Sequence, residues 1–594
     1  MRAVSPRRDA AISVVPVTNS GSRSIGPWLA MLAGLLAFAG CLRADFYMDD
    51  FVFILHSNGN EPAPRHYYLP FFDFTTGQEG PDMQPVVIFQ IIPTAFFVLT
   101  EHLVPNVNGA SWLYHLWNLL FHLGTVCFAF TAGRNVLALA GMLKNDRERS
   151  IAALIGAALF ACHPLCSEPL NYAKCLNSLT VGMFGMMAVS GMAKWLRSGG
   201  RSALAVTAGG LVGAVFSYFP GMAIVVLWLG LLVIFCFRAP ADTPAEPGSG
   251  FSWMVKYKGA VISLTIFLAA VALWRFGGVF AHRWKDWGGL FPAYVLTQGR
   301  LLWEYLVRMV VPVGLCSDHY VPWSLPWKDG IALTGLIGSA VITLAGAILV
   351  LRRQGALRGW GLLTLMGLTP LLLRFGYIIP ELFVEYRTYP SLPWFMLMAG
   401  TGMVALASRF PGLRILPFAG GALVAAIWIL LSVQRNQVWT DRQALARDVL
   451  EKYPLNDRAL TQLQSSALSE GNLEEIKALH LKVMALGQGV ADFNESHPNR
   501  RYDFGRQSDS IFRSYGFMVW AMAYSEGSAK GLEWTERSIK ELTAQMPEKF
   551  AGDSEGLIRA YPLLMARDAV AAHRDEIDAR IKEGAARAAA GNGQ

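Results

Sequence analysis

Charged residues are scarce in this sequence. Only 16% of the 594 residues are Asp, Glu, Lys or Arg, and 53% are hydrophobic, whereas about a quarter of a soluble domain is charged. The scarcity extends to about residue 433 and then disappears. Because the chain is also too long for one hydrophobic core, we predict an all-α protein in three parts. These are a basic cytoplasmic N-terminus (1–25), a polytopic membrane domain (26–433) and a soluble helical domain (434–594).

Cysteine is scarce as well. The chain has 7 cysteines, most of them in apolar runs and none after residue 433, which argues against a disulfide scaffold. The stretch "CHPLC" places Cys162 and Cys166 four residues apart with His163 between them, a spacing that could hint at a metal ion. We favour small packing residues at a helix end and predict no resident metal or other cofactor.

Long apolar runs are abundant. A helix needs about 20 apolar residues to cross a bilayer, and about eleven runs approach or reach this length. They lie near 26–43, 112–134, 150–162, 175–194, 203–218, 221–237, 259–280, 331–351, 360–379, 393–408 and 415–433. The first run ends in "CLRADFYMDD", without the small-residue cleavage site of a signal peptide, so we predict that it stays as a span.

Basic residues gather in alternate loops, including 134–149, 194–201, 238–258, 352–358 and 409–414. Such loops face the cytoplasm, and the net charge of +8 is therefore better explained by topology than by nucleic-acid binding. With an odd number of spans, the C-terminal domain lies on the exoplasmic side. We predict a multi-pass protein of a bacterial inner membrane with a cytoplasmic N-terminus and a periplasmic C-terminal domain.

Acidic residues gather in the loops predicted on the exoplasmic side, 44–83, 282–330 and 380–392. The first loop carries Asp49 and Asp50 in "ADFYMDDFVFIL". One interpretation is a solvated turn that caps a helix, because Asp favours first turns. The other is that the aromatic neighbours bury one carboxylate and make it a usable general base. Carboxylate oxygens could also hold a divalent cation, although two acids alone make a weak site.

Two further patterns carry polar groups. His115, Asn118 and His122 recur on one stripe of the predicted span at 112–134. Helix–helix hydrogen bonding is the favoured interpretation, and a proton relay or a cavity wall is the alternative. In "VEYRTYP", Arg387 suits an anionic phosphate, or it forms a salt bridge with Glu385 or Glu381.

Five segments together resemble the GT-C superfamily of multi-pass glycosyltransferases, in particular its O-mannosyltransferase-like membrane proteins with TPR repeats. In order, they are "FYMDDFVFILHSN", "MQPVVIFQ", "YHLWNLLFHL", "LFACHPLCSEPLNY" and "VEYRTYPSLPW". The resemblance covers about 40–440. It implies a sugar donor on a polyprenyl-phosphate carrier, transfer with inversion, and an exoplasmic protein or glycan as acceptor. The chain lacks a GxxxxGK(S/T) loop, which agrees with a donor that is not a nucleotide sugar.

The resemblance also implies roles for individual residues. Asp49 would be the catalytic base and Asp50 its support, while Arg387, with Lys174, would bind the carrier phosphate. The other residues expected to bind donor or acceptor are His115, Asn118, His163, Glu168, Glu385 and Tyr389.

Three departures leave charge partners out of the family pattern. Gln84 replaces an arginine before Pro85, Leu176 and Ser178 stand where an arginine and an acid are expected, and "FSYFPG" (216–221) lacks a Lys-Glu pair. These departures motivate an alternative function, a catalytically inactive membrane-anchored TPR scaffold. A transporter of lipid-linked sugars ranks third, since the acids gather at one face of the membrane.

The soluble domain contains helix pairs that resemble TPR units. They span 456–487, with a turn at Gly471, and 510–542, with a turn at Gly527; a third covers about 553–584. Stacked pairs form a concave surface for a peptide or protein partner. The alternative is a cap that packs on the membrane domain.

Overall fold

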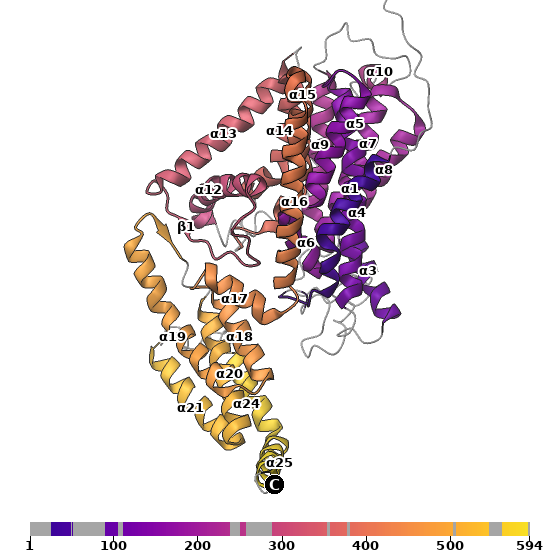
Figure 1. Cartoon of the computed structure of the whole chain (residues 1–594). Helices are drawn as coiled ribbons and strands as arrows, with labels where there is room; N and C mark the ends of the chain where they lie inside the picture. Colours follow the sequence, from indigo (N-terminus) through magenta and orange to yellow (C-terminus); the bar gives the residue numbers. More distant parts are fainter. Residues whose placement is uncertain are drawn as a thin grey trace, which may run out of the picture.

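The fold is almost entirely helical in the described part of the chain (Figure 1). It is seen in a computed structural model that describes residues 25–48, 50, 90–104, 111–237, 250–256, 288–352, 357–376, 381–502, 507–545 and 561–591. Within these ranges the strands are limited to β1 (Trp323–Ser324) and β2 (Arg500–Arg501), which pair in antiparallel fashion. The predicted all-α class is confirmed.

Helices lie over each predicted span apart from 259–280, which lies outside the described residues. The bounds are α1 (Gly26–Phe38) with the 3-10 helix η1 (Ala39–Arg43), α4 (Ser111–Leu139), α5 (Asp146–Ala161), α7 (Leu176–Ser198), α8 (Arg201–Val215), α9 (Phe219–Phe237), α13 (Gly330–Leu351), α14 (Leu357–Leu372), α15 (Leu392–Arg409) and α16 (Ile415–Val438). In the described part, 5 helices are long and apolar enough to cross a membrane, or 6 if one bent pair counts as a single span. The chain thus has the apolar helices of a membrane protein, and the total of about eleven spans stays a prediction.

The helices of the bundle approach one another closely where glycines replace larger side chains. A Cβ atom added to Gly156 on α5 would lie 2.8 Å from the Cα atom of Leu397 on α15. Small residues of this kind let membrane helices pack backbone to backbone, because lipid supplies no hydrophobic drive for their association. The core of the bundle is therefore held by shape complementarity between α4, α5, α7 and α15.

Three further helices precede the tail in the described part of the chain. They are α3 (Ile91–Leu103), α10 (Gly250–Lys256) and α12 (Phe291–Val310). We predicted 282–330 as a loop, whereas α12 forms a 20-residue helix within it. Glu304 forms ion pairs with Arg300 and Arg308 one turn away on either side, at 3.9 and 3.1 Å, and this four-residue spacing supports a helix. The many aromatic residues of this stretch led to its interpretation as a loop, and the spacing of these charges was not recognised.

The C-terminal part (434–594, here called the tail) is a stack of helices below the bundle in Figure 1. Its helices are α17 (Arg442–Lys452), α18 (Asp457–Ser469), α19 (Leu473–Ser496), α20 (Gln507–Glu526), α21 (Ser528–Gln545), α24 (Tyr561–Ala572) and α25 (Arg574–Gly591). Gly471 and Gly527 turn the chain between helices with φ of 70° and 105°, which glycine adopts without strain. Helix pairs therefore occur where the sequence predicts them, although α19 runs on to Ser496; their assignment as TPR repeats stays a prediction.

The stability of the tail should depend on pH through His480. Its ring is buried between α19 and α20, where Nδ1 lies 2.9 Å from the Ser514 hydroxyl. Burial lowers the pKa of His480 from 6.5 to about 4. Because the unfolded chain binds the proton more tightly, the free energy of unfolding should fall as the pH drops from about 6.5 to 4, by up to about 1.4 kcal/mol per pH unit.

Amide hydrogen exchange of α19 and α20 at pH 7 and pH 5, corrected for the intrinsic rates, measures this effect. His480→Gln should flatten the pH dependence because it removes the titrating group. An unchanged pH dependence in that variant would show that other groups cause it.

Candidate functional site

The acidic segment 44–50 lies where the tail meets the bundle. Asp50 is fully buried, and its carboxylate accepts hydrogen bonds from two backbone N–H groups. Oδ2 accepts from Tyr47 at 2.9 Å and Oδ1 from Lys174 at 2.7 Å. Asp50 therefore fastens the acidic segment to the turn before α7, and its predicted support of Asp49 stays a prediction. Asp49 itself lies outside the described residues.

The polar stripe on α4 faces a broken helix. After α5 the chain forms η6 (Pro164–Cys166) and α6 (Ser167–Asn171), bent by 53° from α5. Asn118 Nδ2 lies 3.0 to 3.4 Å from the carbonyl oxygens of Pro169, Leu170 and Tyr172. A break in a membrane helix frees backbone carbonyls, which must find donors inside the protein.

The two histidines of the stripe also contact backbone carbonyl oxygens next to this break. His115 Nδ1 lies 3.3 Å from the Leu170 carbonyl oxygen, and His122 Nε2 lies 3.0 Å from that of Ala161. His122 Nδ1 in turn meets the Tyr389 hydroxyl at 3.0 Å. These contacts support hydrogen bonding between helices rather than a proton relay, and they place Tyr389 against α4.

Replacing Asn118 with leucine should destabilise the bundle. The leucine has nearly the same shape but leaves the carbonyl oxygens of the broken helix without their side-chain donor, which should lower the free energy of unfolding by about 2 kcal/mol. Chemical denaturation of the purified protein in detergent micelles measures this change. Thr131→Val is a matched control on the same helix, because the Thr131 hydroxyl bonds only the Phe128 carbonyl one turn away. Equal stability of the two variants would refute this role.

His163 is engaged on both sides of its ring. Nδ1 accepts from the Leu165 N–H group at 3.1 Å, and Nε2 donates to the Met309 carbonyl oxygen at 3.1 Å. The thiols of Cys162 and Cys166 are buried and lie near backbone carbonyl oxygens. Within the described ranges no group of three or more His, Cys, Asp and Glu side chains is arranged to hold a metal ion. The geometry of "CHPLC" matches packing at a helix end.

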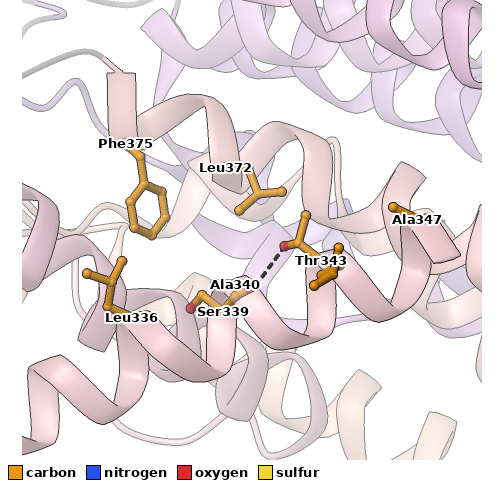
Figure 2. A pocket seen from close by; sticks show the side chains of 8 residues that line it. Leu336, Ser339, Ala340, Thr343, Ala347, Leu372 and Phe375 are labelled. Carbon is orange, nitrogen blue, oxygen red and sulfur yellow. Dashed lines mark hydrogen bonds between the residues drawn. The ribbon is translucent and has the colours of Figure 1, made fainter.

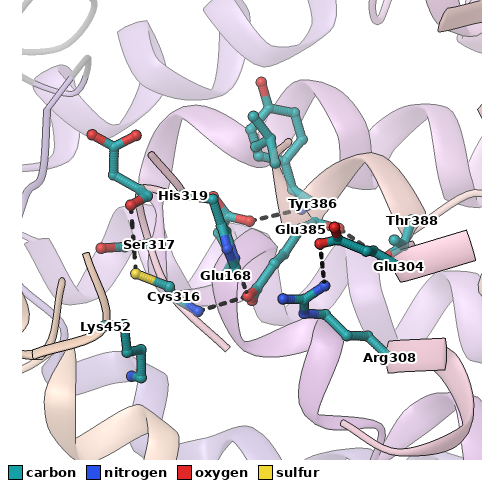
Figure 3. A network of polar contacts seen from close by, with 12 residues as sticks. Glu168, Glu304, Arg308, Cys316, Ser317, His319, Glu385, Tyr386, Thr388 and Lys452 are labelled. Atoms are coloured by element: carbon teal, nitrogen blue, oxygen red, sulfur yellow. Dashed lines mark hydrogen bonds and ion pairs between the residues drawn. The ribbon is translucent and has the colours of Figure 1, made fainter. Parts of the chain in front are cut away.

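Two glutamates form hydrogen bonds at the segment around Glu385, which comes after η9 (Leu373–Gly376) in the chain. Glu168 Oε2 accepts from the Tyr386 N–H group at 2.7 Å. Glu385 Oε1 accepts from the Cys316 N–H group at 2.6 Å and lies 2.7 Å from His319 Nε2. Figure 3 shows these side chains gathered around the 3-10 turn η10 (Glu385–Thr388). Both carboxylates therefore hold backbone in place.

Arg387 is buried in this turn without a carboxylate partner among the described residues. Its Nη1 donates to the backbone oxygen of Glu381 at 2.5 Å, and its Nε has no hydrogen-bond partner there. Glu381 pairs instead with Arg458 at 2.9 Å. The predicted alternative of a salt bridge from Arg387 to Glu385 or Glu381 is therefore not seen.

Arg387 and Arg374 line one cavity, here called the cationic pocket. Its lining residues are Ser178, Val181, Tyr218, Gly221, Ile224, Pro370, Arg374, Tyr386, Arg387 and Pro390. No carboxylate is among them, so two cationic groups face hydroxyl and apolar groups. Guanidinium groups in such a setting favour an anion with several oxygens. The cavity measures about 30 Å³, room for roughly one water molecule, so a phosphate would have to displace the lining side chains.

Arg374 and Tyr218 are the site residues that sequence reasoning missed. A signal existed for Arg374, since an arginine inside a predicted span marks a functional candidate. Ser178, for which the resemblance implied an acid, and Tyr218 of "FSYFPG" both line this cavity. Within the described residues, α7 contributes no carboxylate to the lining of this pocket.

The acidic segment and the cationic pocket are neighbours. Asp50 is bonded to the backbone of Lys174, and Ser178 in the pocket lies one helical turn, about 6 Å, further along the chain. Met48 and Tyr386 also pack in one cluster. The structure thus joins Asp50 to the backbone of Lys174, and Arg387 follows Tyr386 of the cluster that contains Met48, although Lys174 is not among the residues that line the pocket.

An apolar groove is lined in part by η9, the 3-10 helix that also carries Arg374 of the pocket. It runs between α13 and the end of α14 with a volume of about 390 Å³. Figure 2 shows its lining residues, among them Leu336, Ala347 and Phe375. Phe375, which lines the groove, directly follows Arg374, which lines the pocket. Comparisons of the chain with known protein families, with curated proteins and with solved structures find no match.

Proposed function

We propose that the chain is a membrane glycosyltransferase of the GT-C type. It would transfer a sugar from a polyprenyl-phosphate carrier to a hydroxyl group of an exoplasmic protein or glycan, with inversion at the anomeric carbon. In this proposal the bundle crosses the membrane about eleven times, and the TPR-like tail lies on the exoplasmic side. The supports are the ordered motifs of the sequence and the arrangement of charges around Arg387.

The cationic pocket is the observation that carries the proposal. Departure of the sugar leaves the lipid phosphate as an anion, and a preorganised cation stabilises the charge that develops in the transition state. Arg387 and Arg374 offer such cations without a competing carboxylate among the residues that line the pocket. The apolar groove lined by Phe375, the residue after Arg374, suits the first part of a hydrocarbon chain.

The acidic segment supplies the base in this proposal. An acceptor hydroxyl must lose its proton as the glycosidic bond forms, and a carboxylate within hydrogen-bond reach can take it. Both carboxylate oxygens of Asp50 already accept backbone N–H groups, which suits a positioning role. Asp49 is therefore assigned as the base.

Comparison of glycans tests the proposal. Deleting the gene should remove a sugar from exoplasmic proteins or glycans, as measured by mass spectrometry. Wild-type protein should restore it, whereas Asp49→Asn, expressed at the same level, should not. If the glycans stay unchanged after deletion, the result would contradict the enzyme function and favour the catalytically inactive scaffold. A topology reporter at the end of the tail should read exoplasmic, and a cytoplasmic result would contradict the assigned location of the site.

A further inference from the structure

The tail contacts the acidic segment directly. Asp45 donates its backbone N–H group to the Trp439 carbonyl oxygen at 3.1 Å, and its carboxylate pairs with Arg442 at 2.6 Å. The ring of Tyr47 packs edge-on against Trp439, with centroids 5.5 Å apart. The first anchor of the tail, formed by Trp439 and Arg442, therefore holds the stretch that leads to Asp49 and Asp50.

The tail also contacts the segment that carries Arg387. Tyr453 and Arg458 form this second anchor. The Tyr453 hydroxyl lies 2.8 Å from His319 Nδ1, and Nε2 of the same ring lies 2.7 Å from Glu385. Because a carboxylate only accepts, Nε2 donates its hydrogen to Glu385, and the opposite nitrogen of the ring meets the Tyr453 hydroxyl. Arg458 adds an ion pair with Glu381 at 2.9 Å.

Other contacts join the same two bodies besides the two anchors. Trp323 and Ser324 pair with Arg501 and Arg500 as strands, and Arg500 bonds Asp329 at 2.9 Å. Cys316, which precedes His319, lies in the hydrophobic core of the tail. Figure 1 shows α17 next to the end of α16 and beneath α12. These contacts can keep the tail attached when the two anchors are removed.

We propose that the tail is a clamp that sets the geometry between the two halves of the site. Arg442 positions the acidic segment, and Tyr453 acts through His319 on Glu385 and thus on the turn that bears Arg387. Both are positioning residues, since they act through other groups. The inference rests on the proposed function for its catalytic consequence, but the mechanical coupling can be measured without any activity. Two segments more than 300 residues apart in sequence are held by one short stretch of the tail, 439–458.

The test weakens both anchors from the tail side only, by removing the side-chain contacts of Arg442, Tyr453 and Arg458. The variant Arg442→Ala/Tyr453→Phe/Arg458→Ala leaves every residue of the bundle unchanged. A matched control, Tyr524→Phe/Arg537→Ala/Arg580→Ala, removes one hydroxyl and two exposed ion pairs elsewhere in the tail. Amide hydrogen exchange of the full-length protein in lipid nanodiscs is the measurement.

In the anchor variant, exchange in 44–48 and 381–389 should be about 10-fold faster or more, because local opening no longer breaks contacts with the tail. Exchange in α4 and α18 should stay as in the wild type, which shows that both bodies remain folded. The matched control should behave as the wild type throughout. Unchanged exchange in both segments of the anchor variant, or opening of α18 together with them, would overturn the clamp.

A charge exchange tests positioning separately from folding. Arg442→Asp should accelerate exchange in 44–48, and the double variant Asp45→Arg/Arg442→Asp should restore slow exchange because it re-forms the ion pair in reverse. Failure of the double variant to restore protection would overturn the role of Arg442. Sugar transfer should fall and recover in parallel. If protection responds as described while the wild type transfers no sugar, the proposed function fails and the clamp stands.

Discussion

Replacing Arg387 with glutamine is expected to lower the rate of sugar transfer about 100- to 1000-fold, the usual effect of removing one preorganised donor to a developing anion. The reason lies in its surroundings. Arg387 is buried, its Nε has no partner in the described part of the chain, and no carboxylate lines the pocket. A glutamine can still reach toward backbone oxygen but carries no charge, so the loss should appear in transfer more than in folding.

Two further variants sharpen the test at Arg387. Arg374→Gln should reduce transfer less, about 10-fold, because the Arg374 side chain is more exposed than that of Arg387. Arg537→Gln removes an arginine from an exposed ion pair of the tail and should leave transfer unchanged. Transfer by Arg387→Gln at the wild-type rate, with equal expression, would show that the pocket does not hold the departing phosphate.

Replacing each of the two neighbouring aspartates with asparagine is expected to have a different effect on transfer and stability. Asp49→Asn should lower transfer about 100- to 10,000-fold, the contribution of a general base, with no change in the midpoint of thermal unfolding. Asp50→Asn should lower the free energy of unfolding by about 1–3 kcal/mol, because one of its two backbone N–H donors loses its acceptor. Transfer should fall in this variant as well, since the acidic segment is no longer fastened to Lys174.

Thermal unfolding in detergent and transfer assays on the same preparations separate these outcomes. The reverse pattern, an unstable Asp49→Asn and an inactive but fully stable Asp50→Asn, would exchange the two roles. If both variants behaved as the wild type, the acidic segment would not be part of the catalytic site.

Much of the helical framework could be predicted from the sequence because it depends on local patterns. Apolar runs mark the helices of the bundle, and the spacing of His115, Asn118 and His122 puts them on one stripe. What this stripe bonds could not be predicted, since its main partners are backbone carbonyls of α5 and α6. Carbonyls occur at every residue, and only the break after Ala161 makes these few available.

The composition of the cationic pocket could likewise be predicted only in part from the sequence. Arg387 could be named from its segment, but Arg374 and Tyr218 join it only through the packing of α14 and the start of α9 against η10. The anchors of the tail, Arg442 and Tyr453, look like ordinary surface residues of soluble helices. Their partners, Asp45 and His319, lie more than 130 residues away in sequence, and no local pattern records such a contact.

Release of sugar-free polyprenyl phosphate is the most direct test of the central claim. Purified protein in nanodiscs would be incubated with a panel of polyprenyl-phosphate monosaccharides and an exoplasmic protein and glycan extract, and the lipid products would be measured by mass spectrometry. Wild-type protein should release the free carrier from at least one donor, and Asp49→Asn should release none above background. Equal release by both proteins, or no release by the wild type from any donor, would contradict a glycosyltransferase that uses Asp49 as its base.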